Sequence, residues 1–126
     1  MARQRKVSHF HRIIDKSDYL SLSQMEIGSI YEFRYMSKDI YDVRPMVFIL
    51  DKRGIHVRGI NINYLTHYRT DQLLQERKKW AQIPTLRLAR KFQWYELYDK
   101  AIRTYKKSNI KMVRRIDYKY RTEKEI

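Results

Sequence analysis

The sequence predicts an α+β fold, with a small, strongly bent antiparallel sheet or an SH3-like barrel, one or two helices and basic tails. Three observations support this fold class. Several short stretches alternate between apolar and polar residues, or run continuously apolar between turn residues, which is typical of strands. Two stretches in the second half instead repeat their apolar residues at helical spacing. With 126 residues, the chain is long enough for one domain with a single modest core.

The first predicted strand has an aromatic face. Residues 15–29 are expected to form a short helix or turn that leads into it. Residues 29–35 then alternate, and the side chains that share one face are Tyr31, Phe33 and Tyr35. The polar stretch 36–44 follows as a loop.

A hairpin is predicted next. Residues 45–51 are a continuous apolar run, and Pro45 stands at the first position of this strand, where a missing N–H donor is tolerated. Residues 51–54 are polar and end in glycine, which suits a turn between two antiparallel strands. The second strand of the hairpin therefore begins at Gly54.

Residues 54–65 form the least regular strand. Ile55 and Val57 alternate with polar residues, but the apolar positions change parity after Gly59. A glycine inside a strand often marks a bulge or the close approach of another backbone, and short amides offer hydrogen bonds to the chain. The segment is expected to bend into a structural corner built from Gly59, Asn61, Asn63 and Tyr64. The two amides either hold this bend, which we favour, or face a partner.

A helix is predicted over residues 66–80, because its apolar side chains recur at helical spacing. Thr66 or Thr70 is the candidate N-cap of this helix. Residues 81–91 contain Pro84 and are interpreted as a connection.

The longer helix is expected over residues 92–108. The residues that recur at i, i+4, i+7 and i+11 are Trp94, Tyr98, Ala101 and Tyr105. Lys106 and Lys107 would then lie in the last helical turn, where cations complement the helix dipole. Residues 109–121 alternate again and predict a closing strand, with Ile110, Met112 and Ile116 on one face.

The chain is expected to form a single domain over residues 13–120, between a basic arm at 1–12 and a charged tail at 121–126. Cysteine is absent from the sequence, which excludes a disulfide framework and a thiolate metal site. No apolar run approaches the roughly 18 residues of a membrane span, and the N-terminus lacks the apolar centre of a signal peptide. We therefore expect a soluble protein without membrane partners.

Positive charge is the strongest bulk property of the sequence. Its 28 Lys and Arg against 14 Asp and Glu give a net charge of +14, and residues 69–126 hold 17 of the basic residues but 7 of the acidic ones. Such a field attracts polyanions. Nucleic acid, an acidic protein surface and a merely solvated face all remain open as explanations. The candidate contact residues are Arg87, Arg90, Lys91, Lys106, Lys107, Lys111, Arg114 and Arg115.

The eleven tyrosines also allow two interpretations. Interleaved with Lys and Arg, they resemble platforms on which nucleic-acid bases stack. Tyrosine at helical or alternating spacing is more often a core residue, and aromatic residues beside arginine also dominate protein interfaces. Core and interface roles are the stronger expectation.

Metal ligands are not expected. His9 and His11 stand two residues apart in the basic arm, and His56 and His67 lie elsewhere in the sequence. No acidic residue joins these histidines at the spacing of a metal site. We therefore predict no metal or other cofactor, and no small-molecule substrate.

A nuclease is the enzyme alternative. Asp117 and Lys119 have the D-x-K spacing of restriction-type nucleases, and Asp51 or Glu32 could complete a magnesium site. However, this short pattern arises easily in a lysine-rich chain. The sequence also contains no glycine-rich phosphate loop and no nucleophile elbow. The prediction is a protein that is not an enzyme.

Three stretches together carry a resemblance to a known family. They read "IGSIYEFRYMSKDIYDVRPMVFILDKRGIHVRGININYL", "RTDQLL" and "AIRTYKKSNIKMVRRI". Within them, the matching motifs are Gly28, the strand Tyr31 to Tyr35, Tyr41–Asp42, Pro45, the corner Gly59 to Leu65, and Ile102–Arg103–Thr104–Tyr105. This pattern, over roughly residues 27–116, resembles the DNA end-protector or head-completion group of virion proteins in large contractile-tailed bacteriophages.

The resemblance implies a virion structural protein near packaged DNA. Its function would be head completion or DNA end binding at the head–tail region, and its location the virion, assembled in the host cytoplasm. Other virion proteins would be its partners, and DNA a further one. The alternative is a structural adaptor of the neck, tail or baseplate that binds other virion proteins without DNA contact. The resemblance carries over no catalytic residues.

Overall fold

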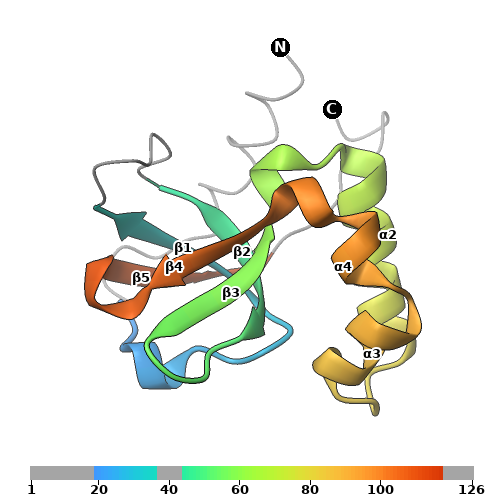
Figure 1. Ribbon diagram of the computed structural model, residues 1–126, viewed down its shortest axis with the longest axis horizontal. Helices are drawn as coiled ribbons and strands as arrows, with labels where there is room; N and C mark the ends of the chain where they lie inside the picture. The colour runs from blue at the N-terminus through green and yellow to red at the C-terminus, as the bar shows by residue number, and fades with distance from the viewer. Residues whose placement is uncertain (1–18, 37–43, 118–126) are drawn as a thin grey trace.

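The fold is α+β, as predicted, and centres on one five-stranded antiparallel sheet (Figure 1). The computed structural model describes residues 19–36 and 44–117. The order of strands across the sheet is β4-β3-β2-β1-β5. The strands are β1 (Ile30–Tyr35), β2 (Met46–Asp51), β3 (His56–Asn61), β4 (Ile102–Lys106) and β5 (Ile110–Ile116).

The helices gather on one side of the sheet, at the right of Figure 1. They are α2 (His67–Lys79), α3 (Thr85–Lys91) and the single turn α4 (Trp94–Leu97). Short 3-10 helices make most of the remaining corners: η1 (Leu22–Gln24), η2 (Ile62–Tyr64), η3 (Asp99–Ala101) and η4 (Lys107–Asn109). No helix among the described residues is long and apolar enough to span a membrane.

The prediction of a strongly bent sheet or an SH3-like barrel is wrong, because the sheet is open and not strongly curled. A closed barrel needs backbone hydrogen bonds between the strands at its two edges. Here β4 and β5 are those edges. The Lys106 N–H at the end of β4 donates instead to the Tyr35 hydroxyl, at 2.9 Å.

Both faces of the sheet are buried. On the helix side, Phe48 meets Trp94 edge to face, with ring centroids 5.8 Å apart. On the other side, the predicted aromatic face of β1 is confirmed, and Phe33 packs edge to face against Tyr105 at 5.2 Å. Met25, from the segment that contains η1, covers this second core. Such aromatic pairs add about 0.5–1.5 kcal/mol beyond the burial of their surface.

The predicted hairpin is confirmed. β2 and β3 pair antiparallel, and Gly54 in the turn between them has a φ of 69°, a left-handed conformation that glycine adopts without strain. Residues 15–29 were expected to form a short helix or turn, and η1 supplies that turn in the described part.

Helix α2 is also confirmed, with Thr66 as its N-cap. The Thr66 side chain accepts a hydrogen bond from the Arg69 N–H at 3.1 Å. The interpretation of residues 81–91 as a connection is wrong, because α3 occupies most of that stretch. Pro84 starts this helix instead of preventing it, since the fixed φ of proline and its missing donor cost nothing before the first turn.

The long helix predicted over residues 92–108 is wrong. Its helical part ends with α4 and η3, and the chain then extends as β4. β4 pairs with the outer edge of β3, from His56 opposite Lys106 to Ile60 opposite Ile102. This pairing outweighs the local helical pattern. Lys106 therefore ends a strand, and Lys107 begins η4, rather than completing a helical turn.

The closing strand is confirmed as β5, but its predicted faces are not. Met112 has a φ of 55°, and the register against β1 shifts nearby. As a result, Ile110 and Val113 both belong to the aromatic core, whereas Ile116 faces the helices and Met112 is exposed. Residues 1–12 and 121–126 lie outside the described residues.

Candidate nucleic-acid interface

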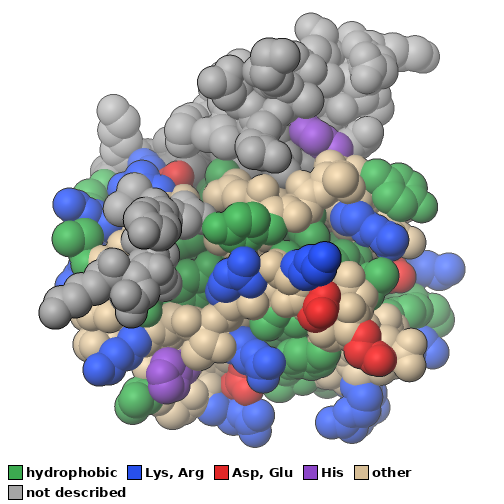
Figure 2. Space-filling view, turned by 45° about the horizontal axis from the view of Figure 1, so that its top comes forward, with side chains coloured by type: hydrophobic (Ala, Val, Ile, Leu, Met, Phe, Trp, Pro, Cys, Tyr) green, Lys and Arg blue, Asp and Glu red, His purple; other side chains and the backbone are tan. Residues whose placement is uncertain are grey.

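The structure divides the eight predicted contact residues among three places. Arg87, Arg90 and Lys91 lie on α3, at the right of Figure 1, whereas Lys106, Lys107 and Lys111 surround η4, between β4 and β5 at the left. Arg114 and Arg115 lie near the end of β5. The eight residues therefore do not form a single surface. On the face shown in Figure 2, Lys and Arg side chains are likewise spread widely, with few acidic ones among them.

Arg114 has a structural partner. Its guanidinium pairs with the carboxylate of Glu32, which is 2% exposed in the sheet, and Arg44 pairs with the same oxygen at 3.3 Å. Removing one partner from a buried carboxylate strongly destabilises the fold. Arg114 is therefore poorly placed to leave Glu32 for a DNA phosphate.

One basic surface combines the ends of two helices. Between Glu76 and Glu96 the sequence has no acidic residue but six basic ones. Five of these are exposed, and we call them the basic helical end: Lys78, Lys79, Arg87, Arg90 and Lys91. The three on α3 were expected from the sequence, but Lys78 and Lys79 were not, because the acid-free stretch crosses the boundary between two elements.

Trp80 joins the two halves of this surface. The Lys79 ammonium lies 5.6 Å from the centre of the Trp80 ring, and the Lys91 ammonium lies 5.3 Å from it. The ring itself packs against Phe92 at the edge of the helix-side core. Cation–π attraction thus holds one lysine from each helix over a fixed aromatic platform.

Of the two amides expected to hold the corner, the Asn61 side chain does so, whereas the Asn63 Oδ1 has no hydrogen-bond partner within the described residues. Asn61 is buried, its Oδ1 accepts a hydrogen bond from the Asn63 N–H at 3.0 Å, and its Nδ2 donates to the Tyr105 hydroxyl at 3.2 Å. A Cβ on Gly59 would collide with the Phe48 carbonyl oxygen, so this glycine permits the close approach of β2. The register shift itself lies in β2, opposite this glycine.

The described tyrosines separate into core and surface residues. Tyr31, Tyr35, Tyr98 and Tyr105 are buried. Tyr64, at the corner, is 55% exposed, and Tyr68, at the start of α2, is 69% exposed. Each exposed ring has an arginine over it: Arg103 lies 4.8 Å from Tyr64, and Arg69 lies 6.0 Å from Tyr68.

The surroundings of Tyr98 and of Asp51 shift the pKa values of both groups. Burial raises the pKa of the Tyr98 hydroxyl to about 12, with a further contribution from the Glu76 carboxylate, which accepts a hydrogen bond from Trp94 at 3.0 Å. Hydrogen bonds from Arg53 lower the pKa of Asp51 at the turn between β2 and β3. Neither group lies in the basic helical end.

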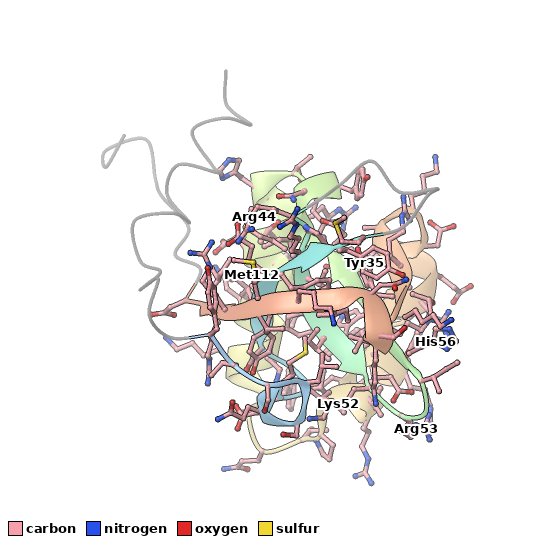
Figure 3. The ribbon with its side chains drawn as sticks, turned by 90° about the vertical axis from the view of Figure 1, so that its left-hand side faces the viewer. Tyr35, Arg44, Lys52, Arg53, His56 and Met112 are labelled. Atoms are coloured by element: carbon pink, nitrogen blue, oxygen red, sulfur yellow. The ribbon has the colours of Figure 1, made fainter. Side chains whose placement is uncertain are left out.

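The residues considered for metal chemistry have other surroundings. Within residues 19–36 and 44–117, no three His, Asp or Glu side chains gather into a possible metal site. Asp51 is paired with Arg53, and His56 lies exposed near the same turn, as Figure 3 shows. His9, His11 and Lys119 lie outside the described residues.

Comparison with family models, with curated proteins and with solved structures gives no match. The site must therefore be interpreted from its own geometry.

Proposed function

We propose that this protein is a non-enzymatic bacteriophage virion protein that contacts packaged DNA, in head completion or DNA end binding at the head–tail region. The observation that carries the proposal is the basic helical end. Five exposed cations and no acidic side chain come from one continuous stretch, and Trp80 fixes two of the lysines. A surface of this kind neutralises phosphates without reading sequence. The motifs over roughly residues 27–116 supply the virion context.

Duplex binding tests the proposal directly. The full chain should bind linear duplex DNA at about 50 mM salt, where the phosphate contribution is strong, with little dependence on sequence. The double variant Lys79→Gln, Lys91→Gln should bind substantially more weakly. Absence of binding by the wild-type chain under these conditions would reject the DNA-contact function.

A matched control locates the binding surface. The double variant Lys106→Gln, Lys107→Gln removes the same charge from the opposite side of the molecule in Figure 1. It should retain most of the DNA affinity. If the two double variants lose affinity equally, binding reflects net charge alone and not the basic helical end.

A second candidate function has its own supporting observation. Tyr64 and Tyr68 are exposed, each beneath an arginine, and neither Arg69 nor Arg103 has an ion pair within the described residues. Exposed tyrosine with arginine is typical of protein-interface hot spots. A neck, tail or baseplate adaptor that docks on an acidic neighbour would use this surface. Tyr64→Ser with Tyr68→Ser should then block incorporation into particles while leaving DNA binding intact.

A further inference from the structure

A second basic surface lies at η4, on the side of the molecule away from the helices (Figure 1). Figure 3 faces this side. The residues of this surface come from the ends of four strands and from η4 itself, and all but the half-buried Lys107 are exposed. We call them the η4 surface: Arg34, Met36, Ile55, Lys106, Lys107 and Lys111. None of them belongs to the basic helical end or to the surface of Tyr64 and Tyr68.

Backbone hydrogen bonds hold the η4 surface together. The Lys107 N–H donates to the Ile55 carbonyl at 2.9 Å, so the chain before β3 is fixed against η4. The Met36 N–H donates to the Asn109 carbonyl at 3.3 Å, which fixes the chain after β1 against the other end of η4. A surface that is already formed loses little conformational freedom when a partner binds, and this favours affinity.

The cations of the η4 surface lack counter-charges. Arg34 of β1 stands directly opposite Lys111 of β5, and Lys106 and Lys107 are adjacent in sequence. Like charges directly opposite each other on neighbouring strands destabilise a sheet. Among residues 19–36 and 44–117, none of these four cations forms an ion pair. Carboxylates from a partner would supply the missing negative charge.

The apolar side chains of the η4 surface favour a protein over a nucleic acid as the partner. Ile55 is 63% exposed and Met36 is 53% exposed. Protein interfaces bury such side chains, and methionine is enriched in them, whereas a phosphate backbone offers them no apolar surface. The tyrosines at this end, Tyr35 and Tyr105, are buried, so neither can act as a platform on which bases stack.

We infer that the η4 surface docks an acidic segment of another protein, whose carboxylates pair with the four cations and whose apolar side chains cover Met36 and Ile55. The inference goes beyond the proposed DNA contact and does not depend on it, because the two surfaces share no residue. The basic helical end and the η4 surface lie on opposite sides of the molecule (Figure 1). One chain can therefore hold the acidic protein on one side and DNA on the other.

The experiment selects binders of the wild-type full chain from a random library of short peptides displayed on yeast. The selected peptides should be net acidic and should contain apolar residues. A synthetic copy of one such peptide should bind the wild type roughly tenfold more tightly than it binds the double variant Lys106→Gln, Lys107→Gln, because two charge pairs are lost. Selected peptides without an excess of acidic residues would overturn the inference.

A matched variant separates the η4 surface from the net charge of the chain. Lys79→Gln, Lys91→Gln removes the same charge from the basic helical end and should keep the affinity for the peptide. DNA affinity should show the reverse pattern, with the loss in Lys79→Gln, Lys91→Gln. If the two double variants weaken peptide binding equally, the peptide responds to net charge alone and the inference is overturned.

The apolar contacts have a test of their own. Ile55→Ser with Met36→Ser replaces two exposed side chains, so the fold should be kept while peptide affinity falls and DNA affinity stays unchanged. Tyr64→Ser with Tyr68→Ser should leave peptide binding intact, and a loss there would place the peptide on the other surface and overturn the inference.

Peptide and DNA binding separate this inference from the proposed function. Peptide binding at the η4 surface by a chain that fails to bind DNA would support the inference and reject the DNA function. DNA binding without any peptide that depends on Lys106 and Lys107 would reject the inference alone.

Discussion

Asn61 shows at the scale of one residue how the corner after β3 is held. Its side chain bonds both the Asn63 N–H and the Tyr105 hydroxyl, and it is 1% exposed. Asn61→Leu should therefore destabilise the fold by about 1–3 kcal/mol, because it leaves buried groups unpaired. Asn63→Leu is the matched control and should cost less, since the Oδ1 of Asn63 has no hydrogen-bond partner within the described residues. Thermal melts of both variants measure the difference; equal losses would contradict the role of Asn61.

Tyr98 gives a prediction about alkaline pH. Its pKa is raised from 10.0 to about 12 in the folded chain, so between these values the unfolded chain releases its proton while the folded chain keeps it. The contribution of Tyr98 to stability is therefore fully present below pH 10 and is lost as pH rises towards 12. Tyr98→Phe should lose less stability over that range than the wild type. Denaturant melts at a series of pH values decide this, and parallel curves would refute it.

At neutral pH, Tyr98→Phe should change stability little. The Tyr98 hydroxyl is buried without a hydrogen-bond partner in the described part of the chain, so its removal leaves no donor or acceptor stranded. The neutral-pH melt is therefore the internal control for the alkaline series.

At the scale of elements, the strands of the first half were predictable because apolar periodicity, turn residues and position all agreed. Residues 92–108 were not, because Trp94, Tyr98 and Ala101 keep helical spacing through α4 and η3. The extended backbone of β4 depends on pairing with the edge of β3, which lies about 45 residues earlier in the sequence. The local spacing of apolar residues cannot show this pairing. The secondary structure of such segments is therefore determined by partners that are distant in sequence.

Prediction of the candidate site was limited in the same way, because the local sequence does not show long-range contacts. Basic composition alone could nominate candidate contact residues in the second half of the chain, and three of these candidates lie on α3. It could not show that Arg114 is paired with a buried carboxylate 82 positions away in sequence. Nor could it show that the ends of α2 and α3 meet at Trp80, which requires the packing of two helices.

Trp80 supplies a prediction at this scale. Trp80→Leu keeps every charge of the basic helical end but removes the ring that positions Lys79 and Lys91. Each cation–π contact is typically worth about 0.5–1 kcal/mol at an exposed site, so DNA affinity should fall by roughly twofold to fivefold for each lysine that loses its position. Fluorescence anisotropy with labelled duplex measures the change. An unchanged affinity in a folded variant would show that Lys79 and Lys91 do not need the Trp80 ring in order to bind DNA.

At the scale of the whole molecule, the proposed DNA binding should depend on salt concentration. If the five cations of the basic helical end neutralise five phosphates, log K should fall with log salt concentration with a slope of about −4.5. The double variant Lys79→Gln, Lys91→Gln should reduce that slope by about 1.8. Titrations at several salt concentrations test both values. A slope near zero would mean that phosphate contacts do not drive binding, whatever the net charge of the chain.

Strand β1 cannot complete its pairing in the sheet until β5 is available. β1 pairs with β5 from Ile30 opposite Ile116 to Tyr35 opposite Ile110, so one edge of β1 has no partner until the end of the domain has been synthesised. Contacts this distant in sequence slow folding, and an unpaired apolar strand can join another chain in the meantime. A nascent chain on the ribosome is therefore most exposed to aggregation just before β5 emerges.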